Sequence, residues 1–152
     1  MIFTSKKQNP DEIKKVAMDL DNALERMNID EILPFFTDDC SVQLLDVKLS
    51  GKEGVKKWLL WMFKNVAAIK LVPIVIMVED DVFFEEFIVQ AKLHDGSDAT
   101  SKQAEVLIYE DYKIKDLRLY FDRLDFANAV AKDPISKGIV RKLIKKSLKG
   151  LV

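Results

Sequence analysis

The feature that most constrains the fold is a change of hydrophobic periodicity near residue 70. Before it, apolar residues recur every three or four positions, as in helices. After it come four extended segments, "KLVPIVIMVED", "VFFEEFIVQAKL", "QAEVLIYE" and "YKIKDLRLYFD", separated by turn formers such as Asp80-Asp81 and the loop "HDGSDATSK". Strands joined by short links pair antiparallel as a meander. Helices first and strands afterwards predict an α+β fold.

Three helices are predicted ahead of these strands. The first begins at Asn9-Pro10, because asparagine is a good cap and proline suits a first turn. A short helix from about Asp30 to Phe36 follows, and then an extended pair in "TDDCSVQLLDVKLSG". The third helix begins at Ser50-Gly51. It carries an apolar stripe of Val55, Trp58, Leu59, Met62, Phe63 and Val66.

Residues 71–78 are apolar on both faces of the predicted strand. A sheet with one face in water would alternate between apolar and polar residues. We therefore expect one face to be covered by the helices and the other by the tail or by a second subunit, which predicts a homodimer through the sheet. Pro73 lacks an amide donor and favours an edge or a bulge.

Composition excludes several classes of protein. The 152 residues suit one domain with a core, and no apolar run approaches the roughly 20 residues that span a bilayer. The first residues, "MIFTSKKQNP", lack a signal-peptide pattern. Cys40 is the only cysteine, which favours a cytoplasmic location. His94 is the only histidine, so neither a zinc site nor a serine–histidine triad is expected, and no cofactor is predicted.

Charge is distributed unevenly along the chain. Residues 132–152 hold seven basic residues and one acid, a net charge of +6, which leaves −7 for residues 1–131 because the whole chain carries −1. We therefore divide the chain into a main domain, residues 1–131, and a basic amphipathic helical extension, residues 132–152. The extension could pack on the protein's own acidic body, within one chain or across a dimer, or dock on a partner or an anionic membrane. We expect the packing. No aromatic residue lies among its lysines, so nucleic-acid binding is not expected.

Three stretches resemble the nuclear transport factor 2-like superfamily, which includes SnoaL-like polyketide cyclases, ketosteroid isomerase and limonene epoxide hydrolase. They are "LPFFTDDCSVQLLD" with the helix start "SGKEGVKKWL", "EEFIVQAKLHDG" and "YKIKDLRLYFD". The resemblance spans roughly residues 10–126. It implies a cone-shaped, strongly curved, antiparallel or mixed sheet wrapped on three N-terminal helices, with a pocket for a small apolar or carbonyl-containing ligand.

The resemblance places Asp46 where the steroid isomerases keep their proton-shuttling acid. A carboxyl against apolar walls has a raised pKa, which suits proton transfer. An ordinary turn-flanking aspartate is the alternative. Residues 10–28 contain no tyrosine, so the oxyanion donor of the isomerases has no counterpart there.

Asp122 falls where the epoxide hydrolases place an acid that activates water. Glu86 and Ile88 stand where those enzymes keep an arginine and a second acid, which argues against epoxide hydrolysis of that type. Arg118, Tyr120 and Asp122 alternate along one face of the last strand. They could bind a carboxylate or carbonyl group, or form a solvated ladder of ion pairs.

The remaining candidates are pocket walls and strand acids. Trp58 and Phe87 are expected to contact the ligand, with Trp61, Phe63, Phe83 and Phe84 as further core and wall residues. Glu85, Glu86 and Glu105 are expected to be exposed or paired with lysines, without the spacing of a metal site. The predicted function is small-molecule binding, with carboxylate acid–base catalysis by Asp46, Asp122 and Tyr120. The alternative is a non-catalytic dimeric binding or interaction module.

Overall fold

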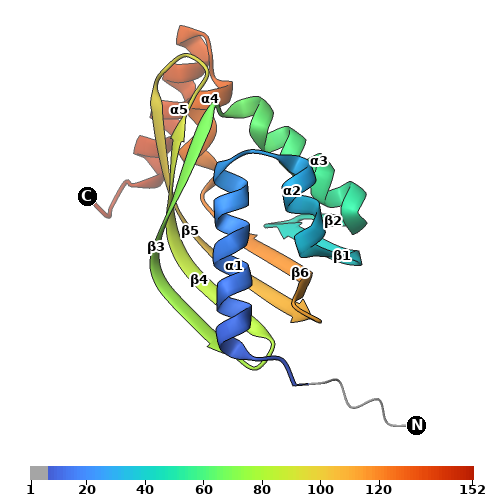
Figure 1. The fold of residues 1–152 in the computed structure, drawn as a ribbon. Coiled ribbons are helices and arrows are strands. Elements are labelled where there is room, and N and C mark those ends of the chain that lie inside the picture. Colours follow the sequence, from blue (N-terminus) through green and yellow to red (C-terminus); the bar gives the residue numbers. More distant parts are fainter. Residues whose placement is uncertain (1–6) are drawn as a thin grey trace.

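The computed structural model describes residues 7–152 and shows helices lying against the inside of a curved sheet (Figure 1). The order of the six strands across the sheet is β2-β1-β6-β5-β4-β3. The strands are β1 (Phe36–Leu44), β2 (Val47–Ser50), β3 (Ala68–Glu79), β4 (Val82–Lys92), β5 (Asp98–Glu110) and β6 (Lys113–Tyr120). The helices are α1 (Pro10–Glu25), α2 (Ile29–Ile32), η1 (Leu33–Phe35), α3 (Gly51–Asn65), η2 (Arg123–Phe126), α4 (Ala127–Val130) and α5 (Pro134–Ser147).

The predicted meander is confirmed, since β3, β4, β5 and β6 pair antiparallel in sequence. The β1 strand instead pairs parallel with β6, which makes the sheet mixed. A register shift between Pro73 and Val75 gives the predicted irregularity in β3. The long strands bend around α1 (Figure 1), so the sheet has a concave inner face toward the helices and a convex outer face.

The α1 helix covers part of the inner face. Asn9 caps it as predicted, because its side-chain oxygen accepts a hydrogen bond of 2.9 Å from the Asp11 amide. The buried stripe on its inner side consists of Ile13, Ala17, Leu20, Ala23 and Leu24. This stripe packs on β3 and β4 and belongs to the core that includes Phe83 and Leu107.

Gln8 fixes the start of α1 to two hairpins of the sheet. Its buried amide nitrogen donates to the Asp81 carboxylate at 2.6 Å and to the Tyr109 carbonyl at 2.9 Å, and its oxygen accepts from the Tyr112 amide at 2.7 Å. The three partners lie 73, 101 and 104 positions away in sequence, in the β3–β4 turn, at the end of β5 and in the β5–β6 turn. These bonds set the register of α1 against the sheet.

The α3 helix begins at Gly51 as predicted, although the Ser50 side chain makes no capping hydrogen bond. Gly54 lets the helix approach β2 closely, because a Cβ at this position would lie 3.0 Å from the backbone carbon of Leu49. Val55, Trp58 and Leu59 are buried against the sheet, mainly on β1. The opposite side of α3 leaves Leu60 and Trp61 about half exposed.

The α5 helix lies in the predicted helical extension and is capped by Asp133, but the expected packing on the protein's own body is not made within a single chain. None of its residues is buried, and Val140 and Ile144 are the only apolar ones that are half-buried. The tail also leaves the outer face of β3 uncovered, where Ile74, Val75 and Met77 are exposed. No helix in the described part of the chain is long and apolar enough to cross a membrane.

Candidate functional site

A largely apolar cavity of about 260 Å³ lies between the inner face of the sheet, α1, α3 and the segment that follows β6. Its volume is slightly below the usual range of small-molecule pockets, roughly 300–1,000 Å³. Aromatic walls come from α3, β4 and the closing segment, and aliphatic ones from α1 and several strands. The main apolar wall residues are Leu24, Leu44, Trp58, Trp61, Phe87, Val89, Leu119, Phe121 and Phe126.

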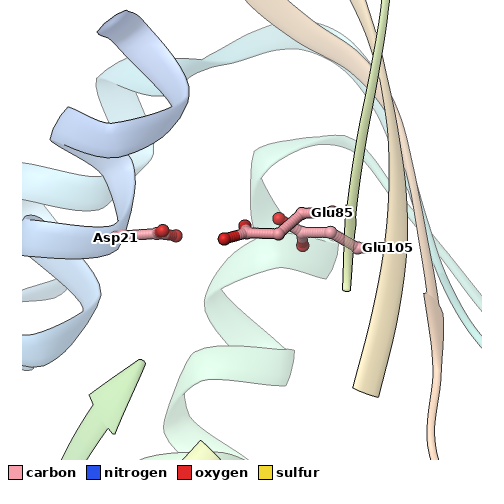
Figure 2. Close-up of side chains that lie close together, drawn as sticks. All are labelled: Asp21, Glu85 and Glu105. Atoms are coloured by element: carbon pink, nitrogen blue, oxygen red, sulfur yellow. The ribbon is translucent and has the colours of Figure 1, made fainter. Parts of the chain in front are cut away.

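Three carboxyl groups meet at the inner end of this apolar space. Asp21 projects from α1 toward Glu85 of β4 and Glu105 of β5 (Figure 2). Glu85 and Glu105 are direct cross-strand partners on the inner face, and one oxygen of each of the three carboxyls lies within 4.8 Å of the other two. Asp21 and Glu105 line the cavity, whereas Glu85 is not among its lining residues. We call these residues the carboxyl triad.

Burial and mutual repulsion favour the protonated forms of the triad. Burial, followed by the charges of Glu85 and Glu25, raises the pKa of Asp21 to about 8. Burial raises the pKa of Glu85 to about 7, against a hydrogen bond with Glu105 that lowers it. Burial, then the charges of Asp21 and Glu85, holds the pKa of Glu105 well above its usual range. Near neutral pH the triad therefore holds both protonated and ionised carboxyls.

Two polar atoms in and beside the triad have no hydrogen-bond partner among the described residues. They are the buried Oε1 atom of Glu85 and the buried hydroxyl of Tyr109. Tyr109 lies four positions along β5 from Glu105 on the same face, and burial, then the Glu105 charge, raises its pKa. Buried polar groups are rarely left unpaired, so these two atoms have hydrogen-bonding capacity that no described residue uses.

The triad is also the arrangement that could hold a cation, through one oxygen from each carboxyl. Calcium prefers six to eight oxygen ligands and magnesium a near-octahedral set with several waters. A metal would also have to displace the protons that the raised pKa values of Asp21 and Glu85 retain near neutrality. Cation binding at the triad would therefore compete with protonation and would weaken as pH falls.

Trp58 and Phe87, the two predicted ligand-contacting aromatics, both line the cavity. Trp58 reaches it from the buried side of α3, and Phe87 from the inner face of β4, two residues beyond Glu85. Both residues therefore lie in the kind of pocket wall that the apolar pattern predicted for them.

The structure does not bring Asp46 and Asp122 into this cavity. Asp46 lies in the β1–β2 turn, with its side chain 84% exposed and paired with Arg123. Asp122 is exposed and caps η2, where its carboxylate accepts from the Leu124 amide at 2.8 Å. Neither carboxyl is desolvated by apolar walls, which was the physical reason for expecting proton transfer there.

The polar row of β6 points away from the cavity. Leu117 and Leu119 are buried on the inner face, so Arg118 and Tyr120 project from the outer face, where Tyr120 is 48% exposed. Arg118 lies 3.3 Å from the carboxylate of Asp116 on the same strand. The polar row therefore does not face a pocket shared with Asp46, because the leucine side chains of β6 take the inner position.

The triad was not predicted from the sequence. Glu86 is paired with Lys102 as expected, but Glu85 and Glu105 are buried. A signal was present: Glu85 alternates with Phe83 and Phe87, which places it on the buried side of its strand. Asp21 similarly follows Leu20 and precedes Leu24 at the edge of the apolar stripe of α1.

Comparison with protein-family models and with curated protein sequences finds no match. Solved structures do match. AclR, a putative hydroxylase from Streptomyces galilaeus, has a TM-score of 0.71 at 17% identity, over 83% of this chain and 89% of that one. A putative SnoaL-like polyketide cyclase from Jannaschia sp. CCS1 has a TM-score of 0.71 at 12% identity, over 85% and 99% of the two chains.

A third similar structure is a protein with a ketosteroid isomerase-like fold from Catenulispora acidiphila, in complex with trimethylamine. Its TM-score is 0.68 at 11% identity, over 76% of this chain and 91% of that one. Identities this low show a shared architecture, and the curved mixed sheet around α1 and α3 is that architecture. The chain has the cone-shaped α+β fold of the nuclear transport factor 2-like superfamily, as the sequence motifs implied.

Proposed function

We propose that the protein binds a small, mostly apolar molecule in the cavity and exchanges a proton with it through the carboxyl triad. The observation that carries this proposal is the position of Asp21 and Glu105, two carboxyls with raised pKa values, at one end of an apolar cavity. Burying three acids together is costly, and carboxyls with strongly perturbed pKa values are typical of functional sites.

The preferred ligand carries one polar oxygen, such as a carbonyl group. One protonated cavity-lining carboxyl donates a hydrogen bond to that oxygen, and the other, once ionised, accepts a proton from an adjacent carbon. Trp58, Phe87 and Leu119 would contact the hydrocarbon part of the ligand. The neighbouring structures described as a putative polyketide cyclase and as a trimethylamine complex support small organic ligands in this fold.

Filling the cavity tests the binding step. Leu119→Trp places an indole ring in the cavity from the inner face of β6. We expect it to weaken binding of the neutral dye N-phenyl-1-naphthylamine at least about tenfold, because the indole takes the ligand's apolar contacts. Fluorescence titration measures this change. The matched control is Tyr120→Trp on the outer face of the same strand, which should bind as the wild type does. Equal dye affinity in both variants would place the binding site elsewhere.

A homodimer through the outer face of the sheet is the second part of this proposal. Met77, Phe84 and Val106 occupy neighbouring positions on three adjacent strands, and Met77 is 58% exposed. Ile74, Val75 and Val82 extend this apolar area along β3 and the start of β4. Apolar patches of this kind mark interaction surfaces.

We expect the wild type to sediment at about twice its chain mass of 17.5 kDa at micromolar concentration. Met77→Glu should shift it to the monomer, because the carboxylate would be buried unpaired in the interface. Val47→Glu, at an exposed position on β2, is the matched control and should leave the dimer intact. A wild type that sediments as a monomer at these concentrations would contradict the dimer without touching the cavity proposal.

A further inference from the structure

The α5 helix presents an apolar face that the domain does not cover. Ile135, Ile139 and Leu143 follow each other at four-residue steps and are 77%, 62% and 52% exposed. They therefore lie on one side of the helix. Leu148 and Leu151, just after the helix, are exposed as well. Only Val140 and Ile144, about a third of a turn away, are half-buried toward the domain.

Basic residues cover the rest of the helix surface. At about 100° per residue, Lys142 and Lys145 lie beside the apolar face, and Lys146 projects from that face near the end of the helix. Lys137 and Arg141 lie on the opposite side, beyond Val140 and Ile144. The one acid of the extension, Asp133, is used as the cap of α5, where it accepts a hydrogen bond of 2.9 Å from the Ser136 amide. The exposed surface of α5 thus combines aliphatic side chains with a net positive charge along its whole length.

We propose that α5 docks on the surface of an anionic membrane. Its Ile135, Ile139 and Leu143 side chains insert at the boundary between headgroups and acyl chains, and the flanking lysines extend to the lipid phosphates. Charge complementarity selects this occupant: an anionic leaflet attracts each basic residue near it, and the extension carries +6. Pairing of α5 with α5 of a second copy would bring two such charges together, which opposes it.

The position of α5 links docking to the cavity, a consequence that rests on the proposed function. The α4 segment directly precedes α5, and its Val130 is 68% exposed while lining the cavity. Trp61, which is 54% exposed, lines the same cavity from α3. A docked α5 would therefore hold the cavity entrance beside the bilayer. The ligand class that this arrangement serves is a lipophilic molecule dissolved in the membrane.

Vesicle co-sedimentation of the full chain tests docking without any knowledge of the ligand. We expect the protein to bind vesicles of phosphatidylcholine containing about 30% phosphatidylglycerol at least about tenfold more strongly than pure phosphatidylcholine vesicles. Raising the salt from about 0.1 M to about 0.5 M NaCl should weaken this binding, because the lysine–phosphate attraction is screened.

Two variants separate the apolar and charged contributions. Ile139→Ser combined with Leu143→Ser should weaken vesicle binding at least about tenfold, because both side chains lose their contact with the acyl region. Lys142→Glu combined with Lys146→Glu should abolish the preference for anionic vesicles. Val47→Ser, an exposed apolar position on β2, is the control and should bind vesicles normally. All variants should keep wild-type dye binding in the cavity, since these side chains are exposed and lie outside it.

Equal binding to neutral and anionic vesicles, or no binding to either, would overturn the proposal. So would a shift of the Ile139→Ser, Leu143→Ser variant from dimer to monomer without any change in vesicle binding, because α5 would then pack on a second copy. Unchanged dye binding in Leu119→Trp together with the expected vesicle binding would contradict the cavity proposal alone. The two proposals can therefore fail separately.

Discussion

Glu105→Gln is expected to slow proton exchange into a bound ketone at least about 100-fold, the usual contribution of a positioned acid or base. Glutamine keeps the size and hydrogen-bonding capacity of the side chain but neither gives up nor accepts the proton. The probe is 2-tetralone, a bicyclic ketone small enough for a cavity of about 260 Å³. In D₂O, mass spectrometry measures the deuterium that enters the carbon next to its carbonyl group.

Asp21→Asn should cause a similar loss, because Asp21 is the other triad member that lines the cavity. Glu85 does not line it and acts through Glu105, its cross-strand partner. Glu85→Gln is therefore expected to displace the pH profile of exchange more than its maximum rate. Glu86→Gln is the matched control, since Glu86 follows Glu85 on the same strand but faces outward toward Lys102.

Exchange that is unchanged in both Glu105→Gln and Asp21→Asn would contradict proton transfer by the triad. If dye still binds and Leu119→Trp still blocks it, the cavity remains a binding site, and the protein is then a non-catalytic binding module. If Asp46→Asn or Asp122→Asn instead removed the exchange, the reaction would lie at the exposed surface of the β1–β2 turn and the start of η2, where these two residues lie.

The elements of the fold were predictable because local signals set them. Asn9-Pro10 and Ser50-Gly51 each mark a predicted helix start that the structure confirms, and α5 forms within the predicted helical extension. The β5 strand begins earlier than predicted, at Asp98, because Ser101 and Lys102 are polar on both faces and conceal the strand pattern. The parallel pairing of β1 with β6 had no local signal, since it joins segments about 75 positions apart.

The site was predictable in its walls but not in its acids. Trp58 and Phe87 are apolar residues on buried faces, so hydrophobic periodicity alone predicts that they point inward. Glu85 and Glu86 are adjacent, and only the direction of the alternation decides which one is buried. In β6 the direction of the alternation likewise decides that Leu119 points inward and Tyr120 outward. A carboxyl on a buried face runs against the usual cost of burial, so composition-based expectations assign it to the surface.

The free energy of unfolding should fall by about 3 kcal/mol or more between about pH 5 and pH 9, because a tenfold change in proton affinity is worth about 1.4 kcal/mol. Burial raises the pKa of Glu85 from 4.5 to about 7, and burial with neighbouring charges raises that of Asp21 from 3.8 to about 8. The folded state therefore binds more protons than the unfolded state across this range. Stability is full below the unfolded pKa values and decreases as pH rises toward the folded ones.

Urea unfolding at a series of pH values, followed by circular dichroism, measures this decrease. In Glu105→Gln the decrease should become smaller, because one buried carboxyl whose pKa is raised by burial is gone. This variant should also be more stable than the wild type near pH 9. Glu86→Gln, which removes only an outward-facing pair with Lys102, should follow the wild-type curve to within about 1 kcal/mol.

The two triad measurements together separate a functional cluster from a structural one. A structural hydrogen-bonded cluster loses stability when one member is replaced, since its partners are left buried and unpaired. A cluster kept for proton transfer is instead relieved by the replacement, so Glu105→Gln should gain stability at high pH while losing exchange. Loss of stability at every pH in this variant would show that the three carboxyls hold the fold together, and the raised pKa values of Asp21 and Glu85 would then be a consequence of packing.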